Sequence, residues 1–284
     1  MKLTDIRCVR QLMESNGSCF QKKFGQNFLI NETIPPRIAS YASPNVLEIG
    51  PGIGTLTRAL SERAERVVSV EIDASLLPIL DVTLADCPNV TVINADIMQV
   101  DVAQLAKTHF GEGEISVCAN LPYNITTPVI MMLLRCGVPF RAITVMVQKE
   151  AADRFAARPG SPACGAVSSA VSYYARVEKL FNVSPGNFIP APKVDSTVIR
   201  FIPYAKPPVE ADEALLMRTI RGAFAQRRKT LLNSLSSEFG EYGKEQLREA
   251  VERAGLSPSC RGETLSLEQF AALSRALQKP DGAL

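Results

Sequence analysis

The stretch Val46-Leu-Glu-Ile-Gly-Pro-Gly-Ile-Gly-Thr-Leu-Thr57 decides the fold. An apolar run over 45–49 leads into a glycine turn, and leucines at helical spacing follow, so the stretch predicts a strand, a tight turn and a helix. Glycine adopts positive φ and lets the backbone approach a ligand closely. The pattern therefore predicts an α/β sheet that binds a ligand where this strand ends, whereas a turn without a ligand is the simpler alternative.

The glycine spacing excludes two common nucleotide sites. Gly50, Gly52 and Gly54 form G-x-G-x-G, whereas a dinucleotide fingerprint requires G-x-G-x-x-G, and Thr55 stands where its third glycine belongs. No Gly-Lys-Ser/Thr follows, so the turn is not a phosphate-binding P-loop either. The turn is therefore typical neither of a nicotinamide dehydrogenase nor of a P-loop nucleotidase.

Two carboxylates follow at the next predicted strand ends. Glu71 ends the strand predicted over 66–71, about twenty residues past the glycine turn, where an acid holds ribose hydroxyls. Asp96 follows the strand predicted over 89–93 and can accept the amino group of an adenine. Each acid alone is as typical of a solvated strand end. Together with Gly50 and Gly52 they predict a site for S-adenosylmethionine.

The segment Asn120-Leu-Pro-Tyr123 follows a fourth buried strand, predicted over 115–119. The side-chain oxygen of Asn120 and the Leu121 carbonyl can accept both hydrogens of an exocyclic amine. Pro122 stiffens the turn, and Tyr123 offers a ring on which a base stacks. These residues predict methyl transfer to an adenine N6. A polar turn, with Tyr123 packed on the following helix, is the alternative.

Strands and helices alternate from 46 to about 204, which predicts a mainly parallel sheet with helices on both faces. A further strand is predicted over 142–147, and the runs 170–183 and 195–202 predict a hairpin at the sheet edge. We expect a Rossmann-like class I methyltransferase sheet with a small C-terminal all-helical domain. In the proline-rich loop between the late strands, Phe188 is a candidate second stacking partner of the base, or else a cap on the core.

The predicted organisation is an N-terminal arm over 1–20 with a short helix, a catalytic domain over 21–205, and a helical RNA-binding domain over 206–284. Arg218, Arg221, Arg227, Arg228 and Lys229 carry five cations without an acid between them. On one straight helix, Arg218, Arg221, Arg228 and Lys229 share a flank that can meet RNA phosphates, and Arg221, Arg228 and Lys229 are the predicted RNA contacts. Arg227 falls near the apolar stripe and favours a structural ion pair.

The bulk properties are those of a chain outside the membrane. Hydrophobic residues make up 46% of its 284 residues, but no run approaches the roughly 18 apolar residues of a membrane helix. The first residues are charged and contain no apolar block, so a secretory signal is absent and a cytoplasmic protein is expected. The seven cysteines form no C-x-x-C pair, which argues against a metal site.

The chain resembles the ribosomal RNA adenine dimethyltransferase family, most closely its bacterial small-subunit branch. The resemblance runs from about Phe20 to about Leu277. It rests on six motifs in order: Phe24–Leu29, Glu48–Gly52, Asn120–Ile125, Val147–Glu150, Pro190–Ser196 and Gln226–Thr230. The first 20 residues match nothing in the family, and the tail 279–284 is shorter and less basic than is usual there.

The resemblance implies dimethylation of two adjacent adenosines in the 3'-terminal hairpin of 16S rRNA within the immature small subunit. S-adenosylmethionine is the implied methyl donor, and we expect a monomer. The implied donor contacts are Asn27, Leu29, Gly50, Glu71, Asp96 and Asn120. Three alternatives remain open: an N6-adenine DNA methyltransferase, a 23S rRNA adenine methyltransferase, and a ribosome-assembly or transcription factor that keeps the fold without its chemistry.

Overall fold

The structure is a computed structural model that describes residues 2–17 and 25–278. The chain forms two compact units. The sheet unit comprises Met1–Ala152 and Arg176–Pro203, and the helical unit comprises Asp153–Ala175 and Tyr204–Leu284. The sequence places 153–175 in the catalytic domain, whereas in the structure this segment packs with the helical unit.

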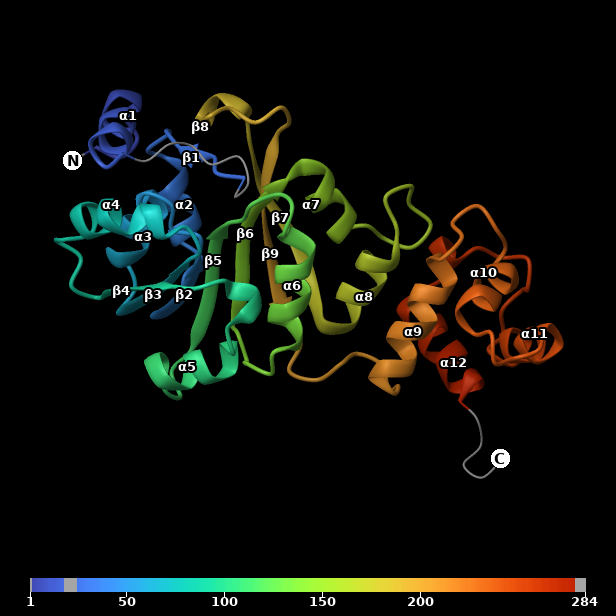
Figure 1. Ribbon diagram of the computed structural model, residues 1–284. Helices are drawn as coiled ribbons and strands as arrows, with labels where there is room; N and C mark the ends of the chain where they lie inside the picture. Colours follow the sequence, from blue (N-terminus) through green and yellow to red (C-terminus); the bar gives the residue numbers. More distant parts are fainter. Residues whose placement is uncertain (1, 18–24, 279–284) are drawn as a thin grey trace. The chain divides into compact units, whose positions relative to one another are not determined.

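The sheet unit is built on a seven-stranded sheet of order β4-β3-β2-β5-β6-β9-β7 (Figure 1). Its strands are β2 (Asn45–Ile49), β3 (Arg66–Glu71), β4 (Val90–Asn94), β5 (Ile115–Asn120), β6 (Ala142–Gln148), β7 (Ala175–Val183) and β9 (Ser196–Pro203). Strands β2 to β6 are parallel to one another, whereas β9 runs antiparallel to its neighbour β6. The carboxyl ends of β2, β3, β4 and β5 therefore lie along one edge of the sheet.

The five predicted parallel strands are confirmed, each to within one residue at either end. The predicted edge hairpin also forms, but its first strand starts at Ala175 because residues 166–174 are helical. Gly165 begins that helix, and its backbone N–H donates to the hydroxyl of Ser168 over 2.9 Å. Val171 and Tyr173 are buried on it, so the apolar run that resembles a strand is a helix face.

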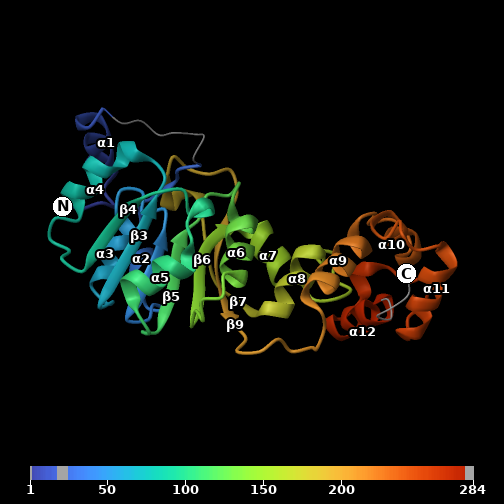
Figure 2. The same ribbon diagram turned by 60° about the horizontal axis from the view of Figure 1, so that its bottom comes forward.

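Helices cover the sheet. The helices of this unit are α1 (Ile6–Ser15), α2 (Ile34–Ala39), α3 (Thr55–Ser61), α4 (Leu77–Thr83), α5 (Val102–Phe110) and α6 (Thr126–Arg135), and α7 (Lys149–Phe155) leads out of it. Apolar residues of α2 and α3 share one buried cluster with strand residues Val46, Val67 and Met146. Helices α5 and α6 lie in front of the strands in the turned view (Figure 2).

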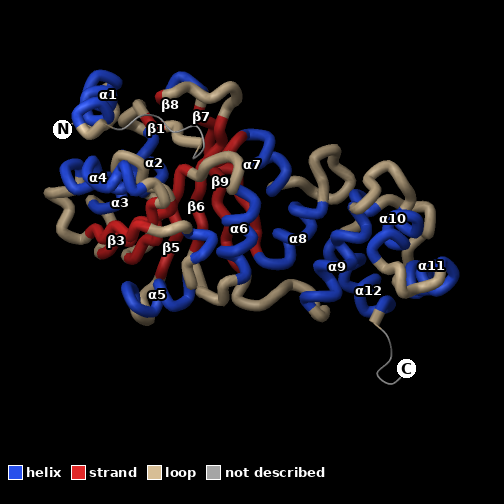
Figure 3. The backbone as a smooth tube through the Cα atoms, in the orientation of Figure 1, coloured by secondary structure: helices blue, strands red, loops and turns tan. Residues whose placement is uncertain are grey.

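Two short strands form a separate ribbon beside the main sheet. β1 (Phe28–Leu29) and β8 (Phe188–Ile189) pair antiparallel, with Leu29 opposite Phe188 (Figure 3). The predicted loose arm is instead partly packed: Val9, Leu12 and Met13 of α1 are buried in one cluster with apolar residues of α4. Its last residues, 18–20, and Phe24 of the first family motif lie outside the described residues.

The helical unit contains α8 (Ala166–Tyr174), α9 (Glu213–Phe224), α10 (Leu231–Glu238), α11 (Lys244–Arg253) and α12 (Leu267–Leu277) around one apolar core. The prediction of one straight helix through Leu216 and Leu235 is wrong, because the chain turns between Phe224 and Leu231. The hydroxyl of Ser234 donates to the Gly222 carbonyl over 2.7 Å and accepts from the Gln226 N–H over 3.0 Å, which fastens α10 against α9. Among the described residues no helix has the length and apolar character needed to cross a bilayer.

Candidate active site

A cavity opens where β2, β3 and β5 end. The residues of the sheet unit that the sequence singled out line it almost without exception: Asn27, Leu29, Gly50, Gly52, Glu71, Asp96, Asn120, Leu121 and Tyr123. They come from the ends of β2, β3, β4 and β5, from β1 and from the residue before it. The structure therefore brings together residues that are up to 96 positions apart in the chain (Asn27 to Tyr123).

The glycine turn shapes the floor of this cavity. Gly50 and Gly52 have φ of 70° and 60°, a conformation that side chains with a Cβ rarely adopt. A Cβ on Gly52 would lie 2.9 Å from the ring of Phe28, so the ring packs directly on the turn. A Cβ on Gly50 would meet no atom within 4 Å, so space remains above that residue for a ligand.

Glu71 is fixed at the end of β3 by the backbone. Its two carboxylate oxygens accept hydrogen bonds from the N–H of Gly52 at 3.1 Å and of Asp73 at 2.8 Å. Burial raises the pKa of this carboxyl, while the two backbone donors oppose the shift. Each oxygen has a second acceptor direction, so the carboxylate fits a pair of vicinal hydroxyls.

Asp96 caps the short helix after β4 and also lines the cavity. Its Oδ1 accepts the N–H of Met98 at 2.9 Å, which holds the carboxylate at the strand end. The apolar residues Ile72 and Ile97 line the same cavity as Glu71 and Asp96. An acceptor for hydroxyls, apolar side chains and an acceptor for an amine together suit an adenosine moiety.

The segment before β1 is tied to this edge at two points. The Asn120 amide nitrogen donates to the Asn27 carbonyl at 2.9 Å, and the Gln26 amide donates to Asp73 at 2.7 Å. A Cβ on Gly25 would touch Pro122 at 3.4 Å, so the segment passes close to the Asn120 turn. The sequence analysis gives Asp73 no role, although an acid two positions after a strand-end carboxylate can indicate a second polar contact at the same strand end.

Two oxygens of the Asn120 turn remain available to a substrate. The Asn120 amide donates through its nitrogen, and its Oδ1 accepts no hydrogen bond among the described residues. The Leu121 N–H donates to the Met146 carbonyl at 3.2 Å, and no described donor reaches the Leu121 carbonyl. Leu121 itself is a buried side chain, so only its backbone can serve the chemistry.

Tyr123 lines the same cavity with its ring held by its hydroxyl. The phenol oxygen lies 2.9 Å from the hydroxyl of Ser196, the first residue of β9. Burial raises the pKa of this phenol, so it stays protonated at neutral pH. Ser196 ends the family motif Pro190–Ser196, but no local pattern indicates that β9 begins beside the Asn120 turn.

Phe188 does not line the cavity. Its side chain is 3% exposed and packs in the cluster that contains Ile34, Ile38 and Val198. In this geometry its ring caps the core, which was the alternative interpretation. A stacking role for Phe188 stays a prediction without support from these contacts.

Glu48, one residue before the end of β2, is a buried acid to which the sequence gives no role beyond its place in the Glu48–Gly52 motif. It is 1% exposed and accepts a hydrogen bond of 2.6 Å from the hydroxyl of Ser69 on β3. Burial raises the pKa of Glu48 to about 7, and the nearby Glu71 carboxylate contributes in the same direction. A second buried acid therefore lies near Glu71.

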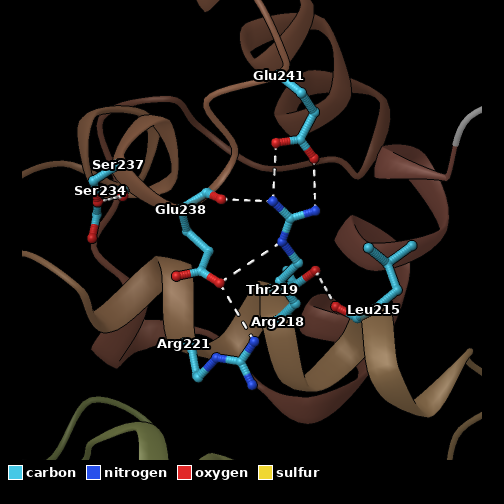
Figure 4. Close-up of polar contacts among 8 residues, drawn as sticks. All are labelled: Leu215, Arg218, Thr219, Arg221, Ser234, Ser237, Glu238 and Glu241. Carbon is cyan, nitrogen blue, oxygen red and sulfur yellow. Dashed lines mark hydrogen bonds and ion pairs between the residues drawn. The ribbon is translucent and has the colours of Figure 1, made fainter.

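The basic residues of the helical unit divide into paired and unpaired side chains. Figure 4 shows Arg218 held by both carboxylate oxygens of Glu241, at 2.6 and 2.9 Å, and by the Glu238 carbonyl at 2.7 Å. Its guanidinium also lies 4.3 Å from the centre of the Phe239 ring. Arg218 is therefore a structural side chain that joins α9 to the end of α10.

The three predicted RNA contacts differ in their surroundings. Arg221 is exposed but lies 3.4 Å from Glu238 (Figure 4). Arg228 and Lys229 stand exposed in the turn between α9 and α10, where no described residue pairs with them. Arg227 forms the predicted structural ion pair, with its Nε 3.7 Å from Glu263.

The model of the ribosomal RNA adenine dimethylase family matches residues 17–279. The chain belongs to this family. It is 46% identical over 277 residues to ribosomal RNA small subunit methyltransferase A of Bacillus cytotoxicus, covering 95% of both chains. The protein of the same name from Bacillus mycoides is equally similar.

Two solved structures extend the comparison. The 23S rRNA methyltransferase ErmE shares 26% identity with a TM-score of 0.66, over 88% of this chain and 99% of that one. A dimethyladenosine transferase from Plasmodium falciparum has a TM-score of 0.73 at 24% identity, over 87% of this chain and 95% of that one, which shows the shared fold. Membership of the adenine dimethylase family confirms the predicted fold class, the enzyme class and S-adenosylmethionine as methyl donor.

Proposed function

We propose that the chain transfers methyl groups from S-adenosylmethionine to the N6 atoms of two adjacent adenosines in the 3'-terminal hairpin of 16S rRNA, during assembly of the small subunit. The observation that carries this proposal is the pair of acceptors at Asn120 and Leu121, which no donor among residues 2–17 and 25–278 engages, beside a cavity suited to adenosine. The relatives named small subunit methyltransferase A support the choice of rRNA. We further propose that it acts as a monomer in the cytoplasm.

The chain's own residues would hold the donor as follows. Glu71 accepts the ribose hydroxyls, Asp96 accepts the adenine amino group, and the backbone at Gly50 and Gly52 lies under the rest of the molecule. The segment of Asn27 and Leu29 forms the opposite wall. When bound, the donor supplies an electrophilic methyl carbon.

The acceptor side activates a poor nucleophile. The N6 lone pair of adenine is delocalised into the ring, so it must be localised before it can attack. Asn120 Oδ1 and the Leu121 carbonyl accept the two N6 hydrogens and draw the nitrogen toward tetrahedral geometry. Both oxygens also stabilise the positive charge that grows on nitrogen, as fixed dipoles do in a preorganised site.

This arrangement needs no side-chain base, because the acceptors act as dipoles and the cationic N6 releases its proton to solvent water once it carries the new methyl group. Tyr123 offers its ring as a stacking face, held in place through Ser196. A monomethylated N6 keeps one hydrogen and can still be held by one of the two oxygens. A second transfer at the same atom is therefore compatible with the same residues.

The helical unit would bind the RNA backbone. Arg228 and Lys229 are exposed and unpaired among the described residues, whereas Arg221 shares its charge with Glu238. Cations that neutralise phosphates release counterions, so binding weakens as salt rises. Arg228 and Lys229 are accordingly the stronger candidates for contact with phosphates.

The main alternative substrate is 23S rRNA, because the chain is 26% identical to the 23S rRNA methyltransferase ErmE. The higher identity to the small-subunit relatives favours 16S rRNA. The test is to incubate the protein and labelled donor with under-methylated small and large subunits and to map the label. Label on the two adjacent adenosines of the 16S hairpin supports the proposal; label on 23S rRNA, or on neither, contradicts it.

A further inference from the structure

A second cavity lies on the sheet unit, and its lining residues differ from those of the donor cavity. Its volume is about 330 Å³, and its lining includes Asn31, Arg37, Asn182, Asn187 and Asp195. Small-molecule and nucleotide groups occupy cavities of roughly 300 Å³ and above. None of these side chains has a role in the donor site.

The guanidinium of Arg37 is held over an aromatic ring. Its central carbon lies 3.7 Å from the centre of the Phe181 ring, and Arg37 forms no ion pair with any described residue. A guanidinium that stacks on a ring keeps its other face and its peripheral N–H groups open. The Arg37–Phe181 stack therefore presents a flat, cationic platform at the cavity.

The amides around this platform have fixed orientations. The Asn31 nitrogen donates to Asn187 Oδ1 at 2.7 Å, and the Asn187 nitrogen donates to the Ser184 carbonyl at 2.9 Å. Asn182 Oδ1 accepts the hydroxyl of Thr197 at 2.9 Å, which leaves the Asn182 nitrogen as a donor to the cavity. The Asp195 carboxylate adds an acceptor without a described partner.

The ribbon joins this cavity to the methyl-transfer site. Leu29 lines the donor cavity, whereas Asn31, two residues later, lines the second one. The Ile30 N–H donates to the Asn187 carbonyl at 2.9 Å, so the strand that lines the donor cavity at Leu29 is hydrogen-bonded to the segment that lines the second cavity at Asn187. An RNA strand with one nucleotide bound at the Asn120 turn can therefore reach the second cavity with a neighbouring nucleotide.

We propose that this cavity binds the base of an rRNA nucleotide that flanks the target adenosine. The base stacks on the free face of Arg37, and its edge bonds to the Asn182 donor and the Asp195 acceptor. Unpaired RNA bases are recognised in this way, by stacking on aromatic or guanidinium planes and by hydrogen bonds to their edges. The inference rests on the proposed function, because it takes RNA as the substrate.

The test measures the Kd for under-methylated small subunits, with methyl transfer to the same subunits followed in parallel. We expect Arg37→Ala to raise the Kd at least about fivefold, the lower end of what one stacked base contributes. Arg37→Lys keeps the charge without the plane and should weaken binding nearly as much. Phe181→Leu, which removes the ring beneath the guanidinium, should act in the same direction.

Arg63→Ala is the matched control. Arg63 is exposed, belongs to the same unit and lies just before β3 begins, at the sheet edge opposite the donor cavity. Its removal deletes the same charge and should leave the Kd unchanged. An unchanged Kd for S-adenosylmethionine in every variant would show that the donor site is intact.

Two outcomes would overturn the inference. If Arg37→Lys binds subunits like the wild type, the cavity attracts phosphate charge and holds no base. If Arg37→Ala and Arg63→Ala weaken binding equally, the effect is one of net charge. Wild-type protein that binds subunits but transfers no methyl group would instead contradict the proposed function, and the binding data would still decide the role of Arg37.

Discussion

The side-chain amide of Asn120 donates a hydrogen bond of 2.9 Å to the backbone carbonyl of Asn27. One bond thereby joins the turn proposed for methyl transfer to the segment that walls the donor cavity. Because the amide nitrogen is engaged, the oxygen of Asn120 is the atom left for the substrate. In the proposed mechanism, Asn120 therefore takes part in both donor binding and substrate activation.

Replacing Asn120 by alanine should lower kcat for methyl transfer roughly 100-fold or more, as loss of a preorganised dipole does in other enzymes. Binding of small subunits should change little, since Asn120 contacts only the target adenine and the other proposed RNA contacts lie elsewhere. Single-turnover transfer with labelled donor measures the loss, and filter binding measures the subunit affinity. A variant with wild-type turnover would remove Asn120 from the mechanism.

Glu71→Ala should raise the Kd for S-adenosylmethionine at least about tenfold, because hydrogen bonds from hydroxyls to a carboxylate contribute roughly 1.5–3 kcal/mol. Titration calorimetry gives the Kd directly. Glu65→Ala removes an exposed acid of the same unit and serves as the control. Equal donor affinity in the two variants would rule out the ribose assignment.

Glu48 predicts a pH dependence of stability. Its pKa is raised from 4.5 to about 7 in the folded chain, so the folded state binds the proton more tightly than the unfolded state. The stability it contributes is present below its unfolded pKa and is lost as pH rises toward about 7.

Glu48→Gln should therefore gain stability relative to the wild type as pH rises from about 5 to about 8, by on the order of 2 kcal/mol. Urea unfolding at both pH values measures the change, with the exposed Glu65→Gln as control. If the difference between Glu48→Gln and wild type is the same at both pH values, Glu48 is ionised throughout the range.

Gly52→Ala should harm the site more than backbone strain alone explains. The left-handed conformation costs a residue with a Cβ about 1–2 kcal/mol, and the new atom would also displace the Phe28 ring that lies 2.9 Å away. Gly137→Ala is the matched control, since Gly137 has a φ of 78° with open space around it. Both variants should lose stability, but only Gly52→Ala should also lose donor affinity.

The unpaired cations of the helical unit should govern the salt dependence of RNA binding. Arg228→Ala should reduce the slope of log K against log salt by about 1, as expected for one lost phosphate contact. Arg221→Ala should reduce it less, because Glu238 already shares the charge of Arg221. Lys244→Ala, at the exposed start of α11, is the control. If the slope is equal in all variants, Arg228 is a solvated side chain that contacts no phosphate.

The sequence predicts the parallel strands closely because short apolar runs end there at Gly50, Glu71 and Asn120, so pattern and boundary agree. It also predicts most of the donor cavity, since the carboxyl ends of parallel strands meet at one edge. The order of the strands in the chain is enough to bring those side chains together.

Two of the failures depend on contacts that no local sequence pattern identifies. The turn after Phe224 carries no proline or glycine, and it is held by Ser234, which bonds back to Gly222 and Gln226. The sequence signal for this turn is the glycine at position 222. In the structure a Cβ there would lie 3.0 Å from Glu238, so the close approach of α10 to α9 requires glycine. The burial of Phe188 follows from pairing with Leu29, a partner that no local pattern identifies.

The helical unit is assembled from two stretches of chain, Asp153–Ala175 and Tyr204–Leu284, with a strand hairpin of the other unit between them. A chimaera made by exchanging only the last eighty or so residues would separate Tyr173 from the core that it completes with Leu216 and Phe270. An exchange of substrate specificity between relatives therefore requires both stretches to be replaced together.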